Sequence, residues 1–283
     1  VNIEDSNVTN DIIGGYGVSG ESKSNVVTVN ASGKNYNNVY GGKGISAEGN
    51  TVNMENGTVA NLIAGDGGRG TAADNVVNWC GGNVTDSLIG GASTTSTGNT
   101  LNMYVADKST DKLANFQKYN FYVPAEFDTY TKNVLNVTED IDMTGANVTF
   151  AKGDGTPYDI VDGSRTISLI LTQGTITGYT DETATHEIKE DVDAEKYLLS
   201  IGNTEVAVKN NNNLVATITA PDEDEKVAVS KNGTLNWDDN TGYFAGVGAF
   251  STTGDISGNE ITFAGGSVVD TADQTEILVS GIT

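Results

Sequence analysis

A five-residue pattern that recurs about every 25 residues restricts the folds open to this chain more than any other feature of its sequence. It reads Asn, then Val or Thr, then an apolar residue, then Asn or Thr, and then a second apolar residue. The copies begin at Asn25, Asn50, Asn75, Asn99 and Asn133, so the first three intervals are 25, 25 and 24 residues. A unit of this size cannot bury an apolar side alone, so successive units have to stack. The repeat therefore predicts a solenoid.

Apolar and polar side chains alternate within each copy, which is typical of a β-strand with one buried face. The positions expected to point inward are Val27, Val29, Val52, Met54, Val77 and Trp79, and those expected to point outward are Thr28, Asn53 and Asn78. Prolines occur only at positions 124, 157 and 221. The strands before residue 124 therefore keep every backbone donor that a stacked sheet needs.

A second marker, two large residues followed by two small ones, comes about fourteen residues after each Asn. Its copies are Ile12-Ile13-Gly14-Gly15, Val39-Tyr40-Gly41-Gly42, Leu62-Ile63-Ala64-Gly65 and Leu88-Ile89-Gly90-Gly91. The position before it holds Asp11, Asn38, Asn61 and Ser87, for which we expect a ladder of polar side chains along the solenoid axis. Glycine is favoured where a backbone turns tightly or approaches another closely. Together the two markers predict an all-β fold, a parallel β-solenoid with coils of about 25 residues.

The regular pattern loosens after Asn99, and the charge changes near residue 133. Residues 1–133 hold 13 acidic and 8 basic side chains, whereas the remaining residues hold 25 and 7. We expect a repetitive solenoid over residues 1–150, with an aromatic-rich irregular coil at 104–132, and an acidic β-rich region over 151–283. Strand-like runs without a fixed period in that last region fit either further solenoid coils or a small β-sandwich.

Composition excludes several partners and cofactors. A formal net charge of -23 argues against binding to nucleic acid or an anionic membrane surface. No apolar run is long enough for a membrane helix, so we expect no membrane insertion by these residues. Cys80 is the single cysteine, which rules out an intrachain disulfide and a cysteine-based zinc site. We expect no metal and no cofactor.

The first residues, Val1-Asn2-Ile3, match the middle of the repeat motif without its leading Asn. We therefore expect the chain to begin inside a coil, as a fragment with more coils upstream. Export would then be directed by sequence outside these residues.

The search for chemistry yields a few candidates, each with a plainer interpretation. Phe116, Tyr119, Phe121 and Tyr122 form the densest aromatic stretch and could stack on a carbohydrate, although we favour core or capping positions for them. His186, the single histidine, lies in an acidic stretch and is expected to be a solvated loop residue. Cys80 follows the inward-facing Trp79 and has no basic cluster around it, so we expect a tolerated thiol rather than a nucleophile. We predict no catalytic residues and no enzyme activity.

The repeat resembles a known family in the forms NTVNMENGTVANLIAGDG and NVVTVNASGKNYNNVYGGKG. These segments look like the Asn, Thr and Gly-rich repeats of autotransporter adhesin-like proteins of Gram-negative bacteria. The segment LANFQKYNFYVPAEFDTYTKNVLNVTEDIDMTGANV is similar to the stretch that follows those repeats. The resemblance covers roughly residues 1–150 and implies a passenger region at the outer membrane surface, with a role in adhesion or biofilm formation.

We therefore expect an extracellular or surface-displayed adhesin fragment, a non-catalytic rod that presents a binding surface. Its expected partners are host glycans, extracellular proteins or other copies of the same chain. Three alternatives remain: a structural filament or coat subunit, a carbohydrate-active β-helix enzyme, and a phage tail fibre or spike.

Overall fold

The computed structural model describes residues 1–156, 164–191, 196–220 and seven short strands between residues 227 and 280. Side chains are described over residues 1–156, 164–185 and 202–220. The chain divides into two compact units. The first comprises Val1–Tyr158, Thr166–Glu182 and Val206–Ala216, and the second Asp159–Arg165, Thr183–Glu205 and Thr217–Thr283.

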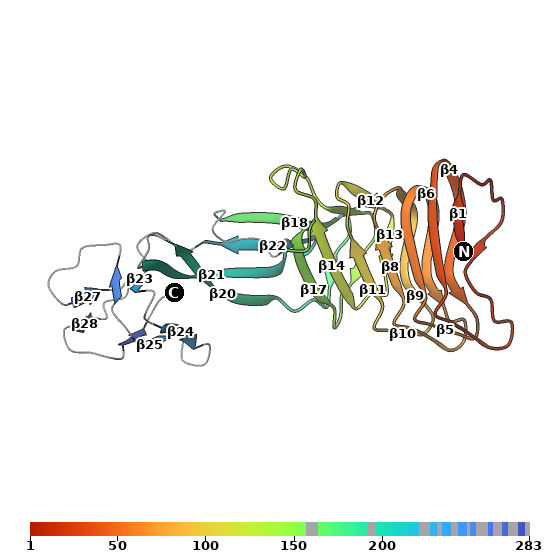
Figure 1. Ribbon diagram of the computed structural model, residues 1–283. Coiled ribbons are helices and arrows are strands. Elements are labelled where there is room, and N and C mark those ends of the chain that lie inside the picture. Colours follow the sequence, from red (N-terminus) through yellow and green to blue (C-terminus); the bar gives the residue numbers. More distant parts are fainter. Residues whose placement is uncertain are drawn as a thin grey trace. The chain divides into compact units, whose positions relative to one another are not determined.

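The first unit is a parallel β-solenoid of about six turns, as the repeat predicts. Its first face contains the repeat motifs that begin at Asn25, Asn50, Asn75 and Asn99, and Figure 1 shows the strands of this face side by side. They are β1 (Asn2–Glu4), β4 (Val26–Lys43), β6 (Thr51–Asp66), β8 (Val76–Trp79), β11 (Thr100–Met103), β14 (Lys118–Val123) and β17 (Asn147–Lys152). Neighbouring strands pair in parallel, so equivalent residues of successive coils lie directly next to one another.

Two further faces complete each coil. The second face stacks β2 (Ile12–Ile13), the later halves of β4 and β6, β9 (Asn83–Ala92) and β13 (Lys112–Ala114). The third stacks β3 (Glu21–Lys23), β5 (Ser46–Glu48), β7 (Thr71–Ala73) and β10 (Thr95–Thr97). The second sequence marker lies on the second face, where Val39 pairs with Ile12 and Leu62, and Leu62 pairs with Leu88.

The core follows the predicted alternation. All six inward positions of the first three regular motifs are fully buried, from Val27 to Trp79. The outward positions Thr28, Asn53 and Asn78 are half-buried, because their side chains bond to each other along the stack. The expected ladder on the second face is also present, with Asn38 donating to Asp11 at 2.7 Å and Asn61 donating to Asn38 at 3.0 Å.

One predicted coil is wrong. The motif at Asn133 forms β15 (Leu135–Val137), which pairs with β12 (Lys108–Thr110) and β18 (Arg165–Thr172) rather than with β11. The strand that stacks on β11 is β14, in the aromatic stretch. This strand fits there because Tyr119 and Phe121 fill the inward positions opposite Leu101 and Met103. The Asn-led motif therefore does not by itself identify the strand that continues the first face.

Antiparallel pairing appears in the later part of the chain. Here β16 (Ile141–Asp142) still pairs in parallel with β19 (Ile176–Thr177). Further on, β20 (Glu182–Asp191) lies beside β21 (Lys196–Lys209), and β22 (Asn213–Thr219) pairs between β18 and β21. The antiparallel pairs join β21 to β23 (Val227–Ser230), β23 to β26 (Phe250–Thr252), β24 (Thr234–Asp238) to β25 (Tyr243–Val247), β25 to β29 (Ile277–Ser280), and β27 (Glu260–Thr262) to β28 (Val268–Asp270).

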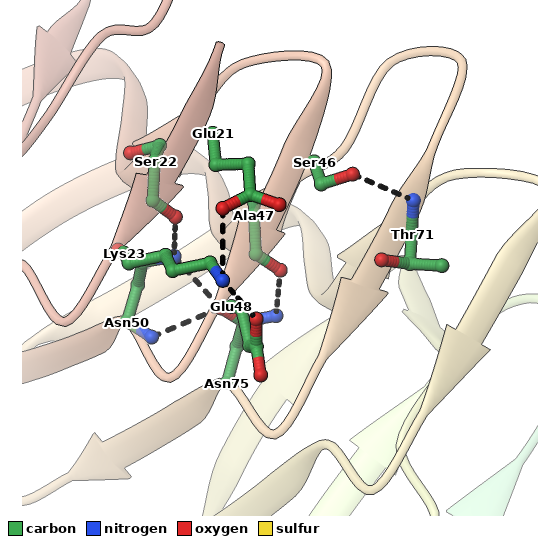
Figure 2. Close-up of polar contacts among 9 residues, drawn as sticks. All are labelled: Glu21, Ser22, Lys23, Ser46, Ala47, Glu48, Asn50, Thr71 and Asn75. Atoms are coloured by element: carbon green, nitrogen blue, oxygen red, sulfur yellow. Dashed lines mark hydrogen bonds and ion pairs between the residues drawn. The ribbon is translucent and has the colours of Figure 1, made fainter.

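The leading asparagines of the motif form a buried hydrogen-bonded ladder. Figure 2 shows Asn50, whose backbone N–H and Nδ2 both donate to Oδ1 of Asn75, at 3.0 and 2.9 Å. Its Nδ2 also donates to the backbone oxygen of Ser22 at 3.0 Å. The Oδ1 of Asn50 accepts two bonds from Asn25. Asn75 repeats the arrangement with Asn99 and with the backbone oxygen of Ala47. Each amide therefore joins three coils and leaves no polar atom of its own unpaired.

The small residue that ends the second marker makes room for this ladder. A Cβ added to Gly65 would lie 2.5 Å from Nδ2 of Asn75, closer than real side chains approach. Gly91 stands in the same relation to Asn99, where the distance would be 2.7 Å. The two sequence markers therefore work together, since the glycine that ends the second marker leaves space for the asparagine that begins the following motif.

Replacing Asn75 by Ala removes the acceptor for two donors of Asn50 and the donor to Ala47. We expect the free energy of unfolding to fall by roughly 2–4 kcal/mol, because buried polar groups lose their partners. Urea unfolding followed by circular dichroism measures this. The matched control is Asn78→Ala, three residues further on the same coil and half-buried, which should cost about 1 kcal/mol or less. An equal loss of unfolding free energy in the two variants would contradict a stabilising role for the buried ladder of Asn50, Asn75 and Asn99.

Gly65→Ala should also destabilise the solenoid, by about 1–3 kcal/mol, because the added methyl group overlaps the Asn75 side chain. The comparison is Gly20→Ala, since no atom lies within 4 Å of a Cβ built there. Thermal unfolding followed by circular dichroism compares the stability of the two variants. A Gly65→Ala protein as stable as Gly20→Ala would mean that the glycine does not serve the ladder.

Candidate functional site

A pocket of about 830 Å³ opens on the first unit, where strands of the first face end. Cys80 directly follows β8, and Tyr104 directly follows β11. The loop Pro124–Asp128 follows β14, and Gly153 and Asp154 follow β17. In a parallel stack the carboxyl ends of all strands meet at the same edge, so these residues, distant in sequence, line one pocket.

Two stacked tyrosines dominate the apolar part of this region. The rings of Tyr104 and Tyr122 lie 4.5 Å apart at an interplanar angle of 4°. They follow Met103 and Phe121, which are paired in register, so the separation of the rings is close to the spacing of adjacent strands, roughly 4.8 Å. The solenoid itself therefore holds the two rings parallel.

The order of the coils leaves one face of Tyr104 less covered. Tyr122 occupies the coil on one side, and Cys80 occupies the equivalent place on the other. A cysteine is much smaller than a tyrosine, and Tyr104 remains 40% exposed beside the pocket. Burial, together with the nearby Tyr122 and Cys80, raises the pKa of the Tyr104 hydroxyl above its ordinary value.

The polar lining is balanced in charge, in contrast to the chain as a whole. Three lysines and three acidic residues line the pocket: Lys108, Lys132, Lys152, Glu126, Asp128 and Asp154. The chain carries a net charge of -23, so this local balance is a departure from its average. Lys132 also contacts Asp107 at 2.5 Å, and Lys108 donates to Asn83 at 3.4 Å.

Two of the acidic side chains are held ionised by their own turns. The hydroxyl of Thr131 and the backbone N–H of Tyr130 donate to Asp128 and lower the pKa of its carboxyl. The hydroxyl and N–H of Thr156 do the same for Asp154, at 2.6 and 2.9 Å. A glycoside hydrolase needs one carboxyl with a raised pKa as its general acid. Both aspartates are instead suited to accept hydrogen bonds.

The aromatic candidates from the sequence lie mostly in the core. Phe116, Tyr119 and Phe121 are each at most 2% exposed. Phe116 packs edge-on against Tyr119, with ring centroids 5.9 Å apart. Tyr122 is half-buried and meets the surface through its stack with Tyr104. Of the four, Tyr122 is therefore the one that contributes to the surface beside the pocket.

Sequence reasoning passed over Tyr104, although a signal for it was present. Tyr104 comes directly after the last residue of the NTLNM motif, and Cys80 comes directly after NVVNW. Aligning the repeats would have placed the two residues next to each other. The lysines could not be found in this way, because they lie outside the repeat motifs: Lys108 begins β12, Lys132 lies in a loop and Lys152 ends β17. His186 falls within β20, and its side chain lies outside the described residues.

Within the part of the chain whose side chains are described, no group of three or more His, Cys, Asp or Glu residues could hold a metal ion. The same residues contain no helix capable of crossing a membrane. Comparisons with protein-family models, with curated proteins and with solved structures found no match to this chain.

The thiol of Cys80 reports on the pocket, because it is the single cysteine of the chain. Burial and the nearby Glu55 carboxylate raise the pKa of this thiol, so little thiolate forms at neutral pH. We expect iodoacetamide to alkylate Cys80 more slowly at pH 7 than it alkylates the urea-unfolded chain. The midpoint of the rate against pH should also be higher in the folded protein, and Glu55→Gln should lower it. Equal midpoints for the folded and unfolded chains would contradict this environment.

Proposed function

We propose that this chain is a surface-displayed or secreted bacterial adhesin passenger, a non-catalytic rod that presents a binding surface. The resemblance of its repeats to autotransporter adhesin-like proteins motivates the proposal. Its partners would be host cells, extracellular matrix or neighbouring cells. The observation that carries most weight is that packed apolar side chains fill the interior of the solenoid, whereas the residues that differ from coil to coil lie on its surface and loops.

The interior supports this proposal because it has little room for chemistry. The inward positions are occupied by large apolar side chains, and the buried asparagines bond to one another and to the backbone. A side chain that satisfies its neighbours in this way cannot also bind a substrate. Recognition then belongs to the surface and to the loops that follow the strands.

The lining of the 830 Å³ pocket favours binding over catalysis. The carbohydrate-active enzyme alternative requires a general acid near the substrate. The lowered pKa values of Asp128 and Asp154 argue against such a role for these two residues. The raised pKa of Cys80 likewise makes this thiol a poor nucleophile at neutral pH.

Beads coated with residues 1–283 test the proposal. We expect them to be retained on cultured epithelial cells, on immobilised matrix proteins or on beads carrying the same chain. Retention should be at least about tenfold above that of beads coated with an equally acidic unrelated protein, which controls for charge. A parallel assay for new reducing ends on a panel of polysaccharides should stay at background. Absence of retention on every surface, or release of reducing ends, would contradict the proposal.

A further inference from the structure

We propose that the pocket beside Tyr104 is a saccharide-binding site that takes a neutral sugar unit, with the ring of Tyr104 as its platform. This inference rests on the proposed function, because it names the chemical class of ligand that the displayed surface binds. Three features of the pocket lead to it: a rigid aromatic ring, a mixture of donors and acceptors, and the absence of a charge excess.

The aromatic ring supplies a flat apolar surface of the kind that a sugar ring can cover. The face of an aromatic ring is electron-rich and attracts the weakly positive C–H groups of a pyranose. Tyr104 is held in place by Tyr122, whose ring lies parallel to it at 4.5 Å. Because the platform is already ordered, little conformational entropy is lost on binding. The small side chain of Cys80 leaves the other face of Tyr104 beside the pocket.

The polar groups of the pocket match the hydroxyl groups of a sugar. Each sugar hydroxyl can donate one hydrogen bond and accept two. The ionised carboxylates of Asp128 and Asp154 are acceptors, and the ammonium groups of Lys108 and Lys132 are donors. Each ammonium carries three N–H bonds, so the contacts with Asn83 and Asp107 do not exhaust either lysine.

The charge balance of the lining selects a neutral ligand. With three lysines and three acidic residues, the pocket offers no net attraction to an anion or a cation. The chain as a whole carries a net charge of -23, which disfavours the approach of acidic polysaccharides and acidic peptides. The volume of about 830 Å³ falls within the ~300–1,000 Å³ range of small-molecule sites. Because the pocket is open to solvent, one unit can be bound while a longer glycan continues outside.

Saturation-transfer NMR with the full chain tests this inference. The probes are neutral tetrasaccharides of glucose, N-acetylglucosamine, mannose and galactose, with tetragalacturonate as the acidic comparison. We expect at least one neutral probe to bind with a dissociation constant of about 1 mM or lower. Tyr104→Ala should weaken that binding at least ~10-fold, whereas Tyr104→Phe should keep it within ~2-fold. The matched control is Tyr16→Ala, which removes an exposed tyrosine outside this pocket and should leave binding unchanged.

A second measurement needs no substitution and so does not depend on a variant that folds. A neutral probe bound beside Tyr104 should slow the alkylation of Cys80, because the thiol lies in the same pocket. Failure of every neutral probe to bind, preference for tetragalacturonate, or unchanged binding in a folded Tyr104→Ala protein would overturn the site. Binding without any protection of Cys80 would do so as well.

The bead assay separates this inference from the function on which it rests. Coated beads that adhere equally well with Tyr104 or with Ala at position 104 would overturn the saccharide site as the adhesive element and leave the proposed function standing. Beads that adhere to none of the surfaces would overturn the proposed function itself. Beads whose adhesion is lost with Tyr104→Ala and inhibited by the same neutral tetrasaccharide would support both.

Discussion

The structure of the regular coils depends on pairing the buried amides of Asn50, Asn75 and Asn99. An asparagine enclosed in a solenoid has to satisfy two N–H bonds and an oxygen without water, which costs stability unless partners are placed accurately. Asn50 and Asn75 find these partners in the coils on either side. The exposed ion pair of Lys23 with Glu48 joins neighbouring coils and that with Glu21 lies within one strand, and both are worth little in water. The buried amides therefore contribute more to holding neighbouring coils together than the surface charges do.

Because the motif strands of the first face pair in parallel without a register shift, features of one motif are repeated in the next at about one strand spacing. The same property that aligns Asn75 with Asn99 also aligns Tyr104 with Tyr122. A rigid aromatic platform on the surface is thus a by-product of the ladder inside. Variation in chemistry then comes from the loops, which can lengthen without disturbing the strands. The segment 124–132 is such a loop, and it brings acidic and basic groups to the platform.

Much of the solenoid was open to prediction because both markers repeat in phase. The coil length, the six inward positions of the first three motifs and the polar ladder at Asn38 and Asn61 were all expected and are present. The error concerned Asn133, whose motif resembles the others but pairs elsewhere. Gln117 accepts the bond from Asn99 at the end of the ladder, with an interval of 18 residues in place of 24 or 25. Because Gln117 stands where the other coils have Asn, and because this coil is shorter, a search for a fixed period does not find the strand β14.

The sequence by itself determined that this chain stacks coils and which side chains fill them, because alternation and period are local properties that one repeat unit already displays. The tertiary structure alone decided which strand of the irregular coil expected at 104–132 stacks on β11, where Tyr119 and Phe121 pair with Leu101 and Met103. The tertiary structure also decided which residues line the pocket. Cys80, Tyr104 and Asp128 have no common motif, and they meet because parallel strands bring their ends to one edge.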